Sequence, residues 1–342
     1  SANNLGSPWQ FSHSSHKLHN VAFHQSLQTP GSSTLLRLPS HVGNAWDRCE
    51  GGIVTSNYPS PQKPAETSMI RTALFWEAEK KAALMNLNND FLKEGEVDEP
   101  IRVAKSWLDI VGVDVSTPSP FKEVPEDEKK TNRIFEADAV RTFSSKEYQE
   151  RVIRLLETLY NEFGDYHQGL GYVSSFLNLF LEEEEVKRLC FILNTNEKYT
   201  PEFWKAAPNN YVRDARVFGR LMEISAPAVH TYLNSCAVLP EAYASKWFVG
   251  LCVHVLPFEV LMEFLTLYFT QGWQFLFQFA LELVASIEED MLALQGSIDP
   301  AAAFALLRLD GMRDEKLASV DFTREIVARA KERSVDKDQI SA

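Results

Sequence analysis

The most constraining feature of the sequence is a helical repeat of apolar residues between Ser144 and Phe163. The repeat consists of Tyr148, Val152, Leu155, Leu156, Leu159 and Phe163. This spacing gathers the side chains on one face of an α-helix. Ser144 or Ser145 can cap the helix, and Glu147 can complete a capping box. Period-two alternation, which half-buried strands require, is scarce along the chain. We therefore predict an all-α fold with no sheet.

Similar patterns predict further helices over much of the chain, at Thr67–Leu92, Pro100–Gly112, Tyr172–Leu181, Pro201–Lys205, Val212–Ile224, Pro227–Ser235, Glu241–Leu256, Phe258–Phe269, Trp273–Glu289, Pro300–Leu309 and Phe322–Glu332. Tyr172–Leu181 is apolar almost all round, which is typical of a central buried helix. We expect the charged helix Phe322–Glu332 to stand partly free of the domain. The proline- and charge-rich segment Ser116–Thr131 is predicted to be a surface loop.

The composition divides the chain into four parts. Residues 1–65 are a polar, low-complexity tail or linker rich in Ser, His and Pro, and residues 66–95 are predicted to hold an N-terminal helix. Residues 96–295 form a single large helical domain, followed by C-terminal helices and a tail at 296–342. The tail histidines are interpreted as part of a polar segment rather than a metal site, because no paired helix face accompanies them. They are His13, His16, His19 and His24.

Charge and cysteine content exclude several classes of function. The chain carries 47 acidic and 34 basic residues, for a net charge of −13, which argues against a nucleic-acid partner. The four cysteines form no CxxC pair and indicate free thiols of a reducing compartment: Cys49, Cys190, Cys236 and Cys252. Polar residues interrupt the apolar run Phe264–Leu281, so a buried helix–turn–helix is favoured over a transmembrane segment. With no signal-peptide pattern at the start, we expect a cytoplasmic protein.

The glycines of GDYHQGLGYVSSF, residues 164–176, suggest a phosphate-binding loop, but the motif fails. A P-loop needs Lys and Ser or Thr after its second glycine, and here Leu170 and Gly171 follow Gly169. A dinucleotide fingerprint must follow a strand, whereas this stretch follows a helix. HExxH and GxSxG motifs are absent from the sequence. Cys252 and His254 lie in an apolar helical pattern and are assigned to the core. We therefore expect no self-contained active site and no cofactor of the chain's own.

Two polar residues flank the helix Ser144–Phe163. Arg141 lies before it in FEADAVRTF, and Gln168 follows it in YHQG. A return turn after the helix would bring the two residues, from separate loops, towards one another. Taken alone, Arg141 is typical of a surface ion pair with Asp138, and Gln168 is typical of a turn.

In combination, Phe-x-x-Asp-x-x-Arg-Thr and Tyr-x-Gln-Gly resemble the two finger motifs of the TBC domain, the GTPase-activating domain that acts on Rab GTPases. Further segments resemble this family in the same order: PIRVAKSWLDIVG, APAVHTYL, ASKWFVGLCVHVLPFEVL and FLTLYFTQG. The chain departs from the family pattern at Phe135, Gly171, Leu265 and Thr266, and in the spacing of Arg102 and Trp107. The resemblance identifies a divergent member, with a fold of two helical subdomains.

The resemblance implies a GTPase activator in membrane trafficking that supplies catalytic residues in trans. Arg141 would be the arginine finger, and Gln168 would replace the glutamine of the Rab-type small GTPase that orients the attacking water. The supporting residues would be Asp138, Thr142, Tyr166 and Gly169. GTP and Mg²⁺ would be carried by the partner, through which any peripheral contact with membranes would arise. The alternatives are a non-catalytic Rab-binding scaffold or effector with the same fold and an unrelated helical adaptor. The identity of the Rab and the oligomeric state stay open.

Overall fold

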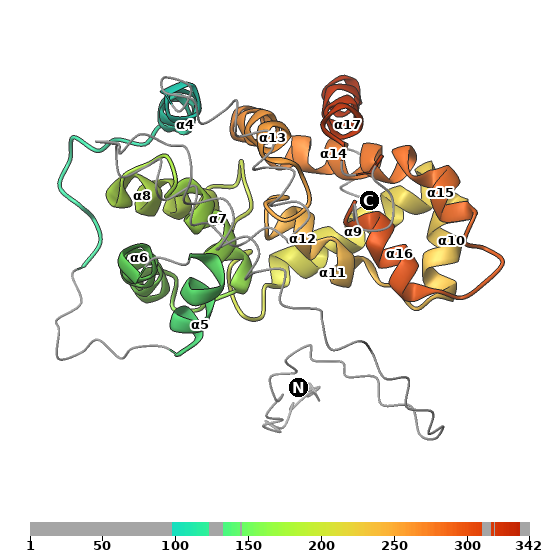
Figure 1. The fold of residues 1–342 in the computed structure, drawn as a ribbon, viewed down its shortest axis with the longest axis horizontal. Coiled ribbons are helices and arrows are strands. Elements are labelled where there is room, and N and C mark those ends of the chain that lie inside the picture. The colour runs from blue at the N-terminus through green and yellow to red at the C-terminus, as the bar shows by residue number, and fades with distance from the viewer. Residues whose placement is uncertain (1–97, 123–132, 144–145, 310–315, 318, 336–342) are drawn as a thin grey trace, which may run out of the picture. The chain divides into compact units, whose positions relative to one another are not determined.

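The computed structural model describes residues 98–122, 133–143, 146–309, 316–317 and 319–335. All of them belong to one compact unit, residues 53–342. They form helices and connecting turns without a β-strand in this part of the chain, so the prediction of an all-α fold is confirmed (Figure 1). The predicted helix Thr67–Leu92, the tail histidines and Cys49 lie outside the described residues.

Three helices of the N-terminal half pack around α6 (Lys146–Phe163). Its predicted apolar face is buried except at Phe163, which is partly buried, and the helix contacts α5, α7 and α8. The helices of this half are α4 (Asp98–Val111), α5 (Arg133–Thr142), α6, α7 (Gln168–Leu177) and α8 (Glu183–Thr195). The helix α4 reaches across to α13 as well as to α8, so it links the two halves. The helix predicted at Tyr172–Leu181 corresponds to α7. It is buried as expected, but it begins four residues earlier, at Gln168.

The second half contains the most apolar of the described helices. Its helices are α9 (Asn209–Ser225), α10 (Pro227–Ser235), α11 (Pro240–Tyr243), α12 (Ser245–Phe248), α13 (Phe258–Gln271), α14 (Trp273–Ser286), α15 (Glu288–Leu292), α16 (Pro300–Leu307) and α17 (Val320–Glu332). The run Phe264–Leu281 forms the predicted buried helix–turn–helix. Gly272 joins the two helices at φ +75°, where a Cβ atom would lie 2.0 Å from the carbonyl oxygen of Lys198. Among the described helices, none is long and apolar enough to cross a membrane.

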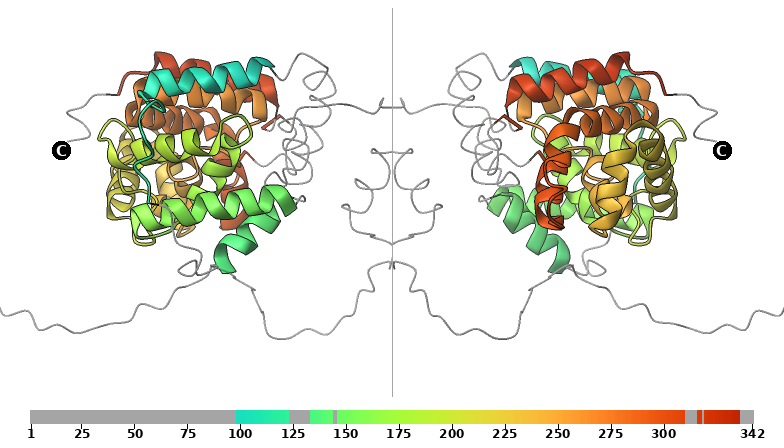
Figure 2. Two further views of the ribbon diagram at one scale, coloured as in Figure 1. Left: turned by 90° about the vertical axis from the view of Figure 1, so that its left-hand side faces the viewer. Right: turned by 90° about the vertical axis from the view of Figure 1, so that its right-hand side faces the viewer.

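The expectation that the last helix stands partly free is wrong. The helix α17 packs against α13 and α14 (Figure 2, right). Ile326, Val327 and Ala330 are buried on one of its faces. On its flank, Arg329 and Arg333 each pair with Glu282 of α14, at 2.9 and 2.8 Å. The many charged residues of this helix therefore border a narrow apolar stripe that docks on the domain.

Two other predicted helices are also wrong. Pro201–Lys205 forms turns, and Glu241–Leu256 breaks into α11, α12 and a run of turns in which Leu251 and Cys252 have positive φ. The break has a tertiary cause. The carbonyl oxygen of Val249 accepts a hydrogen bond from the indole of Trp204 at 3.0 Å, instead of continuing a helix. Apolar periodicity cannot register such a distant partner for a backbone carbonyl.

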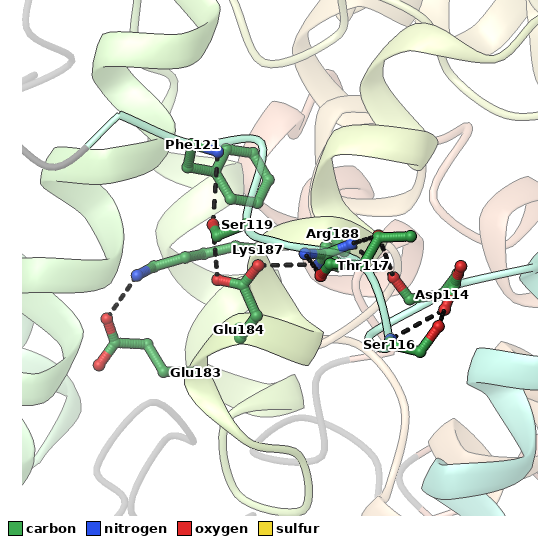
Figure 3. A network of polar contacts seen from close by, with 9 residues as sticks. All are labelled: Asp114, Ser116, Thr117, Ser119, Phe121, Glu183, Glu184, Lys187 and Arg188. Atoms are coloured by element: carbon green, nitrogen blue, oxygen red, sulfur yellow. Dashed lines mark hydrogen bonds and ion pairs between the residues drawn. The ribbon is translucent and has the colours of Figure 1, made fainter.

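The connection that follows α4 is held down by a buried arginine (Figure 3). Arg188 of α8 donates to the carbonyl oxygens of Asp114 and Thr117, and to the Thr117 hydroxyl at 2.9 Å. It also pairs with Glu184 at 2.8 Å. The described part of the predicted surface loop, residues 116–122, is exposed to solvent except at Phe121, and it is anchored at its start. This loop leads along the chain towards α5, which carries Arg141.

Candidate functional site

Arg141 lies in the last turn of α5, and not in a loop as the sequence suggested. The buried face of α5 comprises Phe135, Asp138, Ala139 and Thr142. Arg141 stands at the edge of this face, and 64% of its side chain is exposed. The Thr142 hydroxyl donates to the carbonyl oxygen of Asp138 at 2.7 Å, which is a helical back-bond within α5. A helix thus fixes the backbone beneath Arg141 and leaves most of its side chain exposed.

The junction between α6 and α7 presents Gln168. Gly164 ends α6 at φ +70°. Asp165 then fixes the turn, because its carboxylate accepts from the backbone N–H groups of Tyr166 and Ala206, each at 2.8 Å. His167 caps α7, since its Nδ1 accepts from the N–H of Gly169 at 3.0 Å. Gln168 is therefore the first residue of a capped helix and is exposed.

The side chains of the two segments meet at the carboxylate of Asp138. Oδ1 accepts from Nη2 of Arg141 and from Nε2 of Gln168, the latter at 3.4 Å. Oδ2 accepts from the hydroxyl of Tyr166 at 2.6 Å. Only 6% of the Asp138 side chain is exposed, so its charge is satisfied by donors from two helices and a turn. The predicted residues Arg141, Gln168, Asp138 and Tyr166 are thus brought together.

Gly169 serves packing rather than the turn itself. A Cβ atom at this position would lie 2.7 Å from Cγ1 of Val249 and 2.9 Å from its carbonyl oxygen. The first turn of α7 therefore runs directly over the turns that follow α12. This close approach holds the first turn of α7, which begins at Gln168, against Val249.

Burial controls the protonation of the side chains around Asp138. Burial, and then the charge of Asp138, raise the pKa of the Tyr166 hydroxyl, so Tyr166 stays protonated as a donor. Burial, and then the charge of Lys246, lower the pKa of His167, which favours the neutral ring that can accept from Gly169. The Nζ atom of Lys246 lies 5.4 Å from the ring centroid of Tyr172. Within the described ranges, no cluster of His, Cys, Asp or Glu could hold a metal ion.

Sequence reasoning missed three residues that build this site. Asp165 fixes the turn, Val249 supports Gly169, and Gly171 leaves room for the Tyr166 hydroxyl, which lies 2.5 Å from where a Cβ atom would be. The sequence did offer a signal for Gly171, because a glycine at this position departs from the TBC pattern. The sequence offered no signal for Val249, because its role depends on how the first turn of α7 packs on the turns after α12.

The fold and the arrangement around Asp138 define an all-α protein of the TBC class. The chain belongs to the Rab-GTPase-TBC domain family, whose family model matches residues 115–292. The resemblance seen in the sequence is thereby confirmed.

Relatives and solved structures agree with this assignment. Growth hormone-regulated TBC protein 1-A of Danio rerio is 26% identical over 188 residues, which are 52% of either chain. Growth hormone-regulated TBC protein 1 of Homo sapiens is 28% identical over 171 residues, covering 45% of this chain and 51% of the relative. The chain thus spans about half the length of these relatives. The crystal structure of a Chlamydomonas flagellar RabGAP TBC domain has the same fold, with a TM-score of 0.51 at 17% identity, and covers 80% of this chain and 97% of the other.

Proposed function

We propose that this protein accelerates GTP hydrolysis on a Rab-family small GTPase by inserting Arg141 and Gln168 beside the bound nucleotide. One observation carries the proposal: an exposed arginine and an exposed glutamine, from different helices, share one oxygen of a buried carboxylate. A surface ion pair would need neither the burial of Asp138 nor the glutamine. GTP and Mg²⁺ belong to the partner.

Arg141 supplies positive charge where the reaction develops negative charge. In phosphoryl transfer, charge spreads over the oxygens of the transferred group, and an arginine provided in trans stabilises it. Such a finger accelerates hydrolysis by about 10³–10⁵, or roughly 4–7 kcal/mol of barrier. Asp138 keeps the guanidinium in place through Nη2, and Arg141 exchanges the bond from Nε to the carbonyl oxygen of Ala137 for phosphate oxygens. Most of the Arg141 side chain is exposed, so giving up this one hydrogen bond costs about 1 kcal/mol, well below the gain.

Gln168 orients the attacking water. Its amide has a carbonyl oxygen that accepts from water and an NH₂ group that donates, and it carries no net charge in either role. The Nε2 atom faces Asp138 at 3.4 Å, so the amide is already held from one side. This leaves Oε1 to accept from the nucleophile. Because Gln168 opens the capped helix α7, its backbone is rigid at the point where the water must be aligned.

The test is single-turnover hydrolysis across a panel of GTP-loaded Rab proteins. We expect the wild type to accelerate at least one Rab, and Arg141→Ala to remove about 10³-fold of that acceleration or more. Arg141→Lys should fail too, because an ammonium cannot replace a planar fork of donors. Gln168→Ala should lose at least about 10²-fold. Arg133→Ala is the matched control, since Arg133 is exposed at the opposite end of α5.

The same assay separates activation from binding alone. If the chain binds a GTP-loaded Rab, but hydrolysis is no faster with wild type than with Arg141→Ala, the proposal is wrong. The protein would then be a scaffold or effector that uses the TBC fold without its chemistry.

A further inference from the structure

A glycine within α7 has an unusual neighbour. Gly171 is three residues beyond Gln168, inside the helix, where alanine would normally stabilise by about 0.5–1 kcal/mol. A Cβ atom at Gly171 would lie 2.5 Å from the hydroxyl oxygen of Tyr166, yet 3.7 Å from the ring carbon Cζ that bears the hydroxyl. The steric conflict is therefore with the hydroxyl alone. The missing side chain is what allows a tyrosine, rather than a phenylalanine, to occupy this space.

The hydroxyl of Tyr166 cannot easily move aside. The ring packs edge-on against Phe135 of α5, with centroids 4.9 Å apart. The hydroxyl itself lies 2.6 Å from Oδ2 of Asp138, one turn further along the same helix. Ring and hydroxyl thus contact the helix that bears Arg141, while the backbone of Tyr166 lies two residues before Gln168. Tyr166 therefore connects α5, which carries Arg141, to the turn that leads into Gln168.

We propose that Tyr166 is a positioning residue for both fingers, and that Gly171 is the residue that permits this role; the inference rests on the proposed function. A carboxylate held through Oδ1 alone can rotate about its Cβ–Cγ bond. The Tyr166 hydrogen bond to Oδ2 fixes that rotation, and so fixes the direction from which Oδ1 holds Arg141 and Gln168. Tyr166 does not touch the reacting atoms. Its loss should slow the step at saturating activator and leave the affinity for the GTPase nearly unchanged.

The first experiment measures the energetic coupling between Gly171 and the Tyr166 hydroxyl, and it needs no GTPase. The unfolding equilibrium of the full chain is compared for wild type, Gly171→Ala, Tyr166→Phe and the double variant in urea. In the wild-type background, Gly171→Ala should destabilise, by about tenfold in the unfolding equilibrium constant, because the hydroxyl is forced off the carboxylate. In the Tyr166→Phe background the same change should stabilise, by about two- to fivefold, because the helix gains an alanine. An effect of the same sign in both backgrounds overturns the pairing.

The second experiment measures positioning by single-turnover GTP hydrolysis on the Rab that the wild type activates. Tyr166→Phe and Gly171→Ala should each lower the saturating rate by about tenfold, with the half-saturating concentration changed by less than about twofold. The double variant should be no slower than Tyr166→Phe. Tyr199→Phe is the matched control, because its buried hydroxyl donates to the carbonyl oxygen of Phe269 at 3.0 Å, away from Asp138. It should lose stability and keep the full rate.

The outcomes separate this inference from the proposed function. If Arg141→Ala abolishes acceleration while Tyr166→Phe keeps the wild-type saturating rate, the positioning role is overturned and the proposed function stands. If wild type and Arg141→Ala hydrolyse GTP alike, the proposed function fails and takes the catalytic role of Tyr166 with it. The unfolding comparison still decides in that case whether Gly171 exists to accommodate the tyrosine hydroxyl.

Discussion

Removing the guanidinium of Arg188 should release the connection between α4 and α5. The side chain is 10% exposed and makes hydrogen bonds to Asp114 and Thr117 besides its ion pair with Glu184. In Arg188→Met the aliphatic part of the side chain is retained, while all of these polar contacts are lost. The variant therefore isolates what the guanidinium contributes.

The expected loss in the free energy of unfolding depends on whether water can reach the former partners of Arg188. Hydrogen bonds to a charged group contribute about 1.5–3 kcal/mol each when the abandoned partner stays buried. Here Glu184 is 36% exposed, and Asp114 and Thr117 lie in an exposed loop, so water replaces much of what is lost. We therefore expect the free energy of unfolding to fall by about 2 kcal/mol rather than by the sum. For a domain of this size, that lowers Tm by roughly 4–8 °C.

Urea and thermal unfolding, followed by circular dichroism, measure this effect. Arg102→Met is the matched control, because Arg102 pairs with Glu99 while 74% of its side chain is exposed, and it should leave the free energy of unfolding nearly unchanged. Arg188→Lys should lose about 1 kcal/mol, since one ammonium cannot serve acceptors spread along the loop. The reasoning is refuted if Arg188→Met is no less stable than Arg102→Met. Equal stability of Arg188→Lys and wild type would show that charge alone, and not the fork of donors, holds the loop.

Two further predictions concern the surroundings of the fingers. The pKa of His167 is lowered in the folded state, so the unfolded chain binds more protons, and the free energy of unfolding should decline as pH falls from about 6.5 towards the folded pKa. His167→Asn keeps a cap acceptor that does not titrate and should flatten this decline in urea unfolding at pH 7.5 and 5.5; an unchanged slope would contradict the assignment. Val140 is 57% exposed next to Arg141, so Val140→Asp should raise the half-saturating concentration for a Rab about tenfold, at unchanged stability and saturating rate. Unchanged half-saturation would remove this face of α5 from the docking surface.

Local periodicity predicted the helices well wherever one face of a helix meets one neighbour. The helix α10 begins and ends at the predicted residues, and α6 and the pair α13–α14 follow their apolar patterns closely. Prediction failed where a distant group intervenes. In the expected helix Glu241–Leu256, the carbonyl oxygen of Val249 accepts from Trp204 instead of from a helical N–H group. The C-terminal helix docks with the help of an ion pair between Arg329 and Glu282. Spacing along the chain contains no information about such partners.

The sequence by itself determined the all-α class, the family, and the identity of Arg141, Gln168 and Asp138 as candidates, because residue types at short spacing carry that information. Only the tertiary structure decided that Gln168 and Tyr166 reach a carboxylate 30 and 28 residues before them. It also decided that Gly171 stands where a methyl group would displace the Tyr166 hydroxyl. The physical reason is that a hydrogen bond forms or fails within a few tenths of an ångström. That distance depends on how α5, the turn before α7 and the turns after α12 pack together, and periodicity does not measure it.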